Sequence, residues 1–222
     1  MSQPDRSTAR RLAQESLAKG DAVGWFDALY AEAQGNSSLI PWADMRPNRN
    51  LTDWLARRAP VGAAQRALVI GCGLGDDAEA LAGLGYAVAA FDVSAAAIEW
   101  CRRRFCETRV DYLVADLLRM PVAWQMAFDL VVEIYTLQVL PPELRETAMS
   151  HLARCVAREG TLLVVARARE AEDDRGTMPW PLTAAELAWF TEQGLETIGW
   201  EDYLDDEDPP VRRFRVEYRR PG

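Results

Sequence analysis

From residue 67 to the end of the chain, short apolar runs alternate with helical patterns, and this alternation limits the fold more than any other feature. The helical patterns cover residues 77–83, 95–105, 141–156 and 183–193. The apolar runs read as strands at 67–70, 87–91, 110–114, 130–133, 162–166, 196–202 and 212–219. Strands joined by helices are typical of a parallel sheet. Because an acidic, proline-bearing loop joins the last two strands, we predict a doubly wound, mostly parallel α/β sheet of seven strands whose last strand is antiparallel.

Two helical patterns precede the first strand. Residues 21–33 and 51–59 carry apolar side chains at helical spacing, and Asn50 or Thr52 is the expected cap of the second helix. We expect residues 1–60 to form a helical lid within the same domain and residues 61–222 to form the core. A length of 222 residues suits one domain and is short for two.

The formal net charge of -9 argues against nucleic acid as a substrate, because a negative field repels phosphate backbones. Two runs of basic residues occur in this acidic sequence. We interpret residues 102–104 as the solvated face of a helix and residues 212–220 as the outer face of an edge strand. The acidic runs at 170–174 and 202–208 are interpreted as loops.

Other classes are excluded by composition. No stretch approaches the ~20 apolar residues of a membrane span, and the polar start of the chain lacks the pattern of a secretory signal, so we expect a cytoplasmic protein without a membrane partner. The cysteines Cys72, Cys101, Cys106 and Cys155 form no CxxC pair, and a single histidine gives no zinc spacing. We therefore expect no metal and a small-molecule partner, with the protein a monomer or a homodimer.

The strongest local motif is the glycine loop at residues 71–75, which follows a buried strand and opens a helix. Glycine allows the sharp turn and the close approach of a ligand. The fingerprint of dinucleotide-binding loops would place its last glycine at position 76, where this chain has Asp76, followed by Asp77. Acidic residues at a helix start repel a pyrophosphate, so we expect a cofactor with a cationic centre. S-adenosylmethionine fits this expectation, and a tight turn without a ligand is the alternative.

Two further acidic residues follow predicted strands. Asp92 lies 21 residues beyond the first glycine of the loop, at the end of the second strand. A carboxylate there can accept both hydroxyls of a ribose, while Ser94 is the better cap for the helix that follows. Asp116 follows the third strand and could accept from an adenine amino group, with Leu117 covering the ring. Alone, Asp116 is equally a common turn residue.

Polar side chains also end the fourth strand. Glu133 and Tyr135 lie where the sheet should present its reacting centre, and Glu133 is the best candidate to face the sulfonium or the acceptor. The alternative is that Glu133 pairs with an arginine and Tyr135 packs in the wall. The lone histidine, His151, lies within a helix and is expected to be a packing residue rather than a base.

A family resemblance follows from these residues. The run from Glu133 through Leu140 and Pro141 to Arg145 resembles the motif after the fourth strand in the thiopurine S-methyltransferase-like family, which includes halide and thiol methyltransferases. Residues 41–47, with Trp42, resemble that family's N-terminal tryptophan motif, and residues 178–183 resemble its proline-rich loop. The chain departs from the family at residues 117 and 118, where two leucines replace a frequent aromatic pair.

The resemblance implies a Rossmann-like methyltransferase fold with N-terminal helices that cap the site. It also implies that Trp42 lies against the cofactor and that Glu133 and Tyr135 border the acceptor, and we predict these two as the catalytic residues. The expected cofactor-binding residues are Trp42, Gly71, Cys72, Gly73, Asp77, Asp92, Val93, Asp116, Leu117 and Glu133. The expected substrate pocket consists of Trp25, Met45, Tyr135 and Trp180.

Methyl transfer from a sulfonium requires alignment and the exclusion of water. Because no histidine base is expected, an acceptor that is already anionic suits the chain, and we hypothesise S-methylation of a small apolar thiol, with S-adenosylhomocysteine as product. The runner-up is an O- or N-methyltransferase of a small metabolite. A nicotinamide oxidoreductase and a cofactor-binding protein without catalysis are the remaining alternatives.

Overall fold

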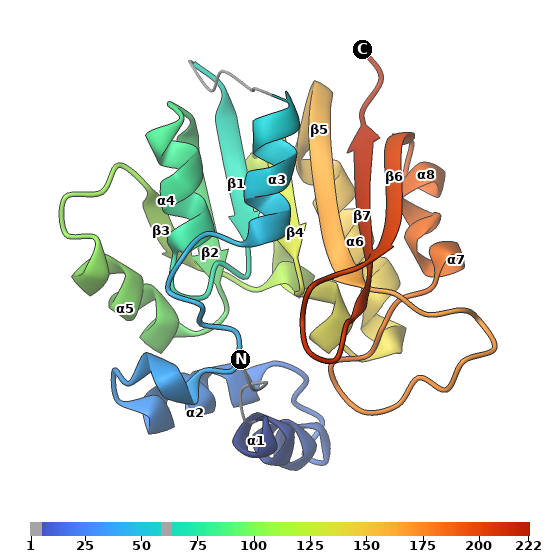
Figure 1. Cartoon of the computed structure of the whole chain (residues 1–222). Helices are drawn as coiled ribbons and strands as arrows, with labels where there is room; N and C mark the ends of the chain where they lie inside the picture. The colour runs from blue at the N-terminus through green and yellow to red at the C-terminus, as the bar shows by residue number, and fades with distance from the viewer. Residues whose placement is uncertain (1–5, 59–63) are drawn as a thin grey trace. The chain divides into compact units, whose positions relative to one another are not determined.

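The computed structural model describes residues 6–58 and 64–222 and contains the seven predicted strands. They are β1 Arg66–Ile70, β2 Ala87–Asp92, β3 Asp111–Val114, β4 Phe128–Ile134, β5 Val156–Arg167, β6 Glu196–Leu204 and β7 Arg212–Arg219. The sheet has the order β3-β2-β1-β4-β5-β7-β6 (Figure 1). Strand β4 runs parallel to β1 and β5, and β2 runs parallel to β3, whereas β7 runs antiparallel to β5 and β6. The predicted fold class is confirmed.

Two compact units make up the chain. One contains Arg66–Ile70 and Leu117–Gly222, with strands β1 and β4 to β7. The other, which we call the glycine-loop unit, contains Gly71–Asp116 and the residues that precede Arg66. The lid over residues 1–60 and the core over residues 61–222 stay predictions, because their boundary falls at residues 59–63, outside the described residues.

The unit of β1 and β4 to β7, which we call the β4 unit, is built around two buried parallel strands. Residues 162–166 of β5 are all buried, and Glu133 on β4 pairs with Ile70 on β1 and Val164 on β5. The helices of this unit are η2 Leu117–Arg119, η3 Val122–Trp124, η4 Leu137–Val139, α6 Pro142–Cys155, α7 Ala184–Leu187 and α8 Trp189–Glu192. Helix α6 packs on β4 and β5, and α8 packs on β6 (Figure 1). The helix predicted over residues 183–193 is thus two short helices, and no residue type in the sequence marks the break.

The prediction for the basic run at residues 212–220 is wrong. Strand β7 lies between β5 and β6 and is not an edge, and Arg213 and Arg215 are 2% and 6% exposed. Carboxylates compensate the burial of these charges. Arg213 pairs with Asp205 at 2.7 Å and also with Glu207. Arg215 pairs with Glu201 at 2.6 Å. The acidic run at 202–208 is likewise only partly a loop, because β6 continues to Leu204.

The glycine-loop unit contains α1 Ser7–Leu17, α2 Gly24–Ala33, η1 Ser37–Leu39, α3 Arg49–Arg58, α4 Asp76–Gly83 and α5 Ala95–Arg104. Helix α1 was not predicted. Helix α2 starts three residues later than predicted, because Asp21 accepts the backbone N–H groups of Val23 and Gly24 in a turn. Helix α3 starts at Arg49, and Asn48, rather than Asn50 or Thr52, accepts a backbone N–H at its start. The predicted last residue of this helix, residue 59, lies outside the described residues.

Helices α1 and α2 pack on each other, and α2 also packs on α5. Across residues 6–58 and 64–222, no helix has both the length and the apolar character that crossing a bilayer requires.

Candidate functional site

The glycine loop connects β1 to α4 and has the backbone that only glycine adopts readily. Gly71, Gly73 and Gly75 have φ values of 55°, 54° and 91°, in the left-handed region. Gly73 also lies close to side chains, because a Cβ built on it would be 3.3 Å from the Tyr30 hydroxyl oxygen. The backbone N–H of Cys72 donates to the Phe91 carbonyl at 2.9 Å, so the loop is joined to the end of β2. Turn geometry and close approach therefore both explain these glycines.

Asp92 lies at the carboxyl end of β2 and holds the glycine loop. Its Oδ2 accepts the Gly73 N–H and its Oδ1 accepts the Ser94 N–H, both at 3.0 Å. The side chain is 6% exposed, and burial raises the pKa of its carboxyl to about 6, against the lowering effect of these hydrogen bonds. Ser94 caps α5 by accepting the Ala97 N–H at 3.1 Å, as predicted. Asp92 is thus a buried acceptor fixed beside the glycine loop, with Val93 next to it in the chain.

The two acidic residues after the loop have different partners. Asp76 forms a bidentate ion pair with Arg104 at 2.8 and 2.9 Å, and Arg104 also donates to the Leu74 carbonyl at 2.5 Å. Asp77 accepts the Asn48 N–H at 2.6 Å, and burial raises the pKa of its carboxyl to about 6. Asp76 therefore repels a pyrophosphate less strongly than predicted, because Arg104 compensates its charge. The prediction that residues 102–104 are a solvated face is wrong for Arg104, whose side chain is 17% exposed.

Aromatic side chains of the N-terminal segment lie against the glycine loop. Trp42 donates from Nε1 to the Tyr30 hydroxyl at 2.9 Å, and the same nitrogen would be 3.7 Å from a Cβ on Gly73. Burial is the main cause that raises the pKa of Tyr30, and the charge of Asp92 raises it further. The structure therefore brings Trp42 together with the loop, and it adds Tyr30, which sequence reasoning treated only as an apolar helix residue.

The other predicted N-terminal pocket residues lie differently. Trp25 is 2% exposed and stacks on Phe26 at 3.8 Å, so its ring is part of the core. Met45 is exposed and has a left-handed φ of 54°. A contact that the sequence did not indicate joins α2 to α5, since Asp27 accepts from the Ser94 hydroxyl at 2.7 Å and from the Ala96 N–H at 3.2 Å.

The thiols near the loop are packing groups. Cys101 donates to the Gly73 carbonyl at 3.2 Å, and a hydrogen bond with Cys101 together with burial raises the pKa of Cys72 well above its ordinary value. All four cysteines are free thiols. No group of three or more potential metal ligands occurs among the residues that the structure describes.

In the β4 unit, Glu133 is a fully buried carboxyl at the end of β4. Its Oε1 accepts the Thr136 N–H at 2.7 Å and the Leu137 N–H at 2.9 Å, so it caps the turn that follows the strand. Within the described ranges, Oε2 has no hydrogen-bond partner. Burial raises the pKa of the Glu133 carboxyl to about 7, although both hydrogen bonds and the charge of Arg145 lower it. Such a carboxyl can take or release a proton near neutral pH.

Tyr135 follows β4 in a conformation that is rare for tyrosine. Its φ is 68°, and its N–H donates to the Val165 carbonyl at 3.0 Å. The Arg213 guanidinium lies 4.6 Å from the centre of the Tyr135 ring, and Asp205 holds Arg213 in place. Left-handed non-glycine residues concentrate at functional sites, so this geometry agrees with a role for Tyr135.

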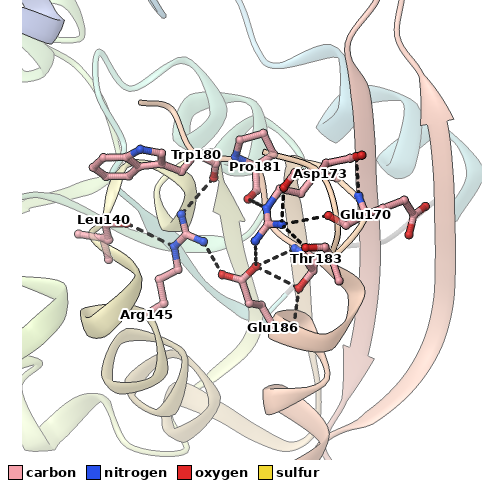
Figure 2. Close-up of polar contacts among 10 residues, drawn as sticks. Leu140, Arg145, Glu170, Asp173, Trp180, Pro181, Thr183 and Glu186 are labelled. Atoms are coloured by element: carbon pink, nitrogen blue, oxygen red, sulfur yellow. Dashed lines mark hydrogen bonds and ion pairs between the residues drawn. The ribbon is translucent and has the colours of Figure 1, made fainter. Parts of the chain in front are cut away.

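Trp180 is anchored through its backbone. Its N–H donates to the Gln138 carbonyl at 2.7 Å. Its carbonyl accepts from Arg145 Nη2 at 3.1 Å, as Figure 2 shows. Arg145 is 1% exposed and forms an ion pair with Glu186 at 2.5 Å. The alternative for Glu133 was a close ion pair with an arginine. Glu133 does not form it, because Arg145 pairs with Glu186 instead.

The remaining predicted residues lie after β3. Asp116 is half-buried, and Leu117 is buried. The Leu117 carbonyl accepts from His151 Nδ1 at 2.8 Å, so His151 has the packing role that was predicted. Contacts thus join Trp42, Gly73 and Asp92 in the glycine-loop unit. In the β4 unit, Glu133 caps the turn that directly follows Tyr135. The Gln138 carbonyl, in the same turn, accepts the Trp180 N–H.

Known proteins resemble this chain in sequence. Residues 67–160 match a family model described as a methyltransferase domain. A ubiquinone biosynthesis O-methyltransferase of Thiobacillus denitrificans is 33% identical over 108 residues, which cover 48% of this chain and 45% of that protein. The chain thus spans less than half of the length of this relative.

Solved structures share the fold. The N-methyltransferase NodS from Bradyrhizobium japonicum, in complex with S-adenosyl-L-homocysteine, has a TM-score of 0.69 at 23% identity and covers 88% of this chain and 100% of its own. The 1,6-didemethyltoxoflavin-N1-methyltransferase of Burkholderia thailandensis has a TM-score of 0.69 at 15% identity and covers 100% of this chain and 92% of its own. Residues 67–160 are therefore similar in sequence to a methyltransferase domain, and the chain shares its fold with methyltransferases of solved structure.

Proposed function

We propose that this protein transfers a methyl group from S-adenosylmethionine to a small molecule. The observation that carries the proposal is the buried carboxylate of Asp92, bonded to Gly73 in a loop of left-handed glycines, within a domain that matches methyltransferases. The relative and both solved structures are named as methyltransferases. The closer resemblance to thiopurine S-methyltransferases remains part of the proposal.

The residues of the glycine-loop unit fit this cofactor. Asp92 offers acceptor oxygens for ribose hydroxyls, and Trp42 offers an aromatic ring beside Gly73. Arg104, the arginine that contacts the loop, is already paired with Asp76 and is not free to hold a phosphate. The other proposed contacts in this unit are Gly71, Cys72, Asp77, Val93 and Asp116, and the roles predicted for Leu117 and Glu133 of the β4 unit toward the cofactor stay predictions. When bound, S-adenosylmethionine supplies an electrophilic methyl group on a sulfonium.

The residues of the β4 unit are proposed to serve the acceptor. Tyr135 and Trp180 would border it, and the fully buried position of Glu133 indicates surroundings from which water is excluded. Exclusion of water favours the reaction of an anion with a cationic donor, because charge is neutralised in the transition state. We therefore propose an acidic thiol as the acceptor, since it needs no base at neutral pH.

Glu133 favours a second candidate. Its Oε2, which has no hydrogen-bond partner among the described residues, and its pKa of about 7 would let it accept the proton of a hydroxyl or an amine. The relative is named as an O-methyltransferase, and both solved structures are named as N-methyltransferases. An O- or N-methyltransferase of a small metabolite is therefore the alternative acceptor class.

Methyl transfer to an acceptor panel tests the proposal. The purified protein is incubated with methyl-labelled S-adenosylmethionine and matched series of small thiols, amines and phenols, and labelled products are counted. Transfer to thiols alone supports the first candidate, and transfer to amines or phenols alone supports the second. Cofactor binding without transfer to any class would leave a cofactor-binding protein without catalysis and refute the proposed activity. The expected cytoplasmic location and the monomeric or dimeric state stay predictions.

A further inference from the structure

We propose that Arg145 is a positioning residue, which fixes Trp180 relative to the turn after Tyr135 and so determines which acceptors are methylated. This inference rests on the proposed function, in which Tyr135 and Trp180 border the acceptor. It concerns contacts within the β4 unit, between the start of α6, the loop before α7 and α7 itself.

The guanidinium of Arg145 joins three segments of the chain. Its Nε donates to the Leu140 carbonyl at 3.3 Å, its Nη2 to the Trp180 carbonyl at 3.1 Å and its Nη1 to Glu186 Oε1 at 2.5 Å (Figure 2). The planar fork of arginine presents its donors in fixed directions, which a lysine ammonium does not. The side chain therefore sets the relative positions of Leu140, Trp180 and Glu186.

Trp180 is held on both sides of its peptide backbone. The N–H of Trp180 donates to the Gln138 carbonyl and its own carbonyl accepts from Arg145, so both groups bond to the segment that follows Tyr135. The neighbouring residues are Pro179 and Pro181, which have a restricted φ and no N–H to form competing bonds. The backbone of Trp180 has little freedom left once Arg145 is in place.

The same segment is fixed at its beginning. Glu133 accepts the N–H groups of Thr136 and Leu137, and the Gln138 side chain accepts the Arg167 N–H at 2.7 Å. Arg145 fixes the other end, five residues after Leu140. A shift at Arg145 would therefore move Trp180 relative to a turn that other contacts hold still.

Stability alone does not account for this arrangement. Burial of Arg145 lowers its pKa, and a buried ion pair is often no more stabilising than apolar residues of the same volume. Glu186 is also engaged on its other oxygen, which accepts from the Thr183 N–H at 2.8 Å and lies 3.8 Å from Arg169. What the ion pair adds is orientation, because each of the three guanidinium nitrogens of Arg145 donates to a different acceptor.

Two variants remove the orientation and keep most of the packing. Arg145→Lys keeps a positive charge beside Glu186 but cannot reach the Leu140 and Trp180 carbonyls together. Glu186→Gln keeps the capping box with Thr183, because glutamine serves at that position, and removes the charge that holds Arg145. Arg154→Lys, at an exposed position on the same helix α6, is the matched control.

Kinetics separate positioning from general damage. We expect the acceptor KM to rise about tenfold in both variants, with the dissociation constant of S-adenosylhomocysteine changed less than about twofold. The control should match the wild type in both constants. Equal losses of acceptor and cofactor binding would indicate a merely structural role for Arg145 and overturn the inference. An unchanged acceptor KM in the two variants would also overturn it.

A spectroscopic measurement needs no turnover. The protein is labelled with 5-fluorotryptophan, and the fluorine signal of Trp180 is assigned by its absence in Trp180→Phe. We expect this signal to shift or broaden in Arg145→Lys and Glu186→Gln and to stay unchanged in Arg154→Lys. If Arg145→Lys does not fold, the Trp180 signal of Glu186→Gln alone tests the positioning role. An unmoved Trp180 signal refutes the positioning role, whereas a wild-type protein that binds no S-adenosylhomocysteine refutes the proposed function instead.

Discussion

Replacing Glu133 by glutamine should make the stability of the protein less dependent on pH. Burial raises the pKa of the Glu133 carboxyl from its ordinary value of 4.5 to about 7. Between these values the folded protein keeps a proton that the unfolded chain has lost. The free energy of unfolding of the wild type should therefore fall as the pH rises from 4.5 to about 7, and the loss should be complete above the folded pKa.

The magnitude follows from the same displacement. At about 1.4 kcal/mol per pKa unit, the rise from 4.5 to about 7 corresponds to roughly 3 kcal/mol. Glutamine does not titrate, but its amide oxygen can still accept the Thr136 and Leu137 N–H groups. The difference in unfolding free energy, variant minus wild type, should therefore grow by roughly 3 kcal/mol between pH 4.5 and pH 8. The contributions of Asp77 and Asp92 are the same in both proteins and cancel.

Urea denaturation at pH 5, 6, 7 and 8 measures this difference. Glu146→Gln, an exposed substitution on α6, is measured in parallel as the control for replacing a glutamate by glutamine. In thermal melts, 1 kcal/mol corresponds to about 2–4 °C for a chain of this size, so the Glu133→Gln difference should change by roughly 6–12 °C. A Glu133→Gln difference that does not change with pH would refute the view that burial raises the pKa of this carboxyl.

Three other substitutions test the glycine-loop unit. Asp92→Asn should weaken S-adenosylhomocysteine binding about 10- to 100-fold by loss of a charged acceptor, as measured by calorimetry; unchanged affinity would exclude Asp92 from the cofactor site. Gly75→Ala should cost about 2 kcal/mol or more in urea denaturation, because φ is 91° and the new Cβ would overlap the Tyr112 hydroxyl, whereas Gly83→Ala, with open space around its Cβ, should cost less than about 1 kcal/mol. Asp27→Asn should lower stability by about 1 kcal/mol, because it weakens two contacts between α2 and α5; equal stability would show that these contacts are not maintained in solution.

The parts of the fold that could be predicted depend on local patterns. Each strand was marked by an apolar run, and the glycine loop was marked by residues that allow left-handed φ at 71, 73 and 75. The Ser94 cap was predictable because a cap acts on the next turn of its own helix. Helix α1 escaped prediction because its buried face consists of Leu12 with two small residues, Ala9 and Ala13, which give little apolar contrast.

The errors concern partners that are distant in the sequence. Asp76 loses its expected role because Arg104, 28 residues away, pairs with it. Arg213 and Arg215 are buried because carboxylates of β6 and of the following loop neutralise them, and a basic run alone does not reveal those partners. The cap at Asn48 was missed because the helix begins earlier than its apolar pattern.

In the candidate site, position in the sequence made Asp92 and Glu133 candidates, but it could not show what they contact. The hydrogen bond from Gly73 to Asp92 depends on the folded structure, as does the lack of a partner for Glu133 Oε2 among the residues that the structure describes. Tyr30 was missed for a similar reason, since only the fold places its hydroxyl beside Trp42 and Gly73.

Calorimetric titration of the wild-type protein with S-adenosylhomocysteine, and separately with NADH, tests the central claim most directly. The account predicts saturable heat with S-adenosylhomocysteine at a stoichiometry of about one per chain and none with NADH. Saturation by NADH with no heat from S-adenosylhomocysteine would contradict it.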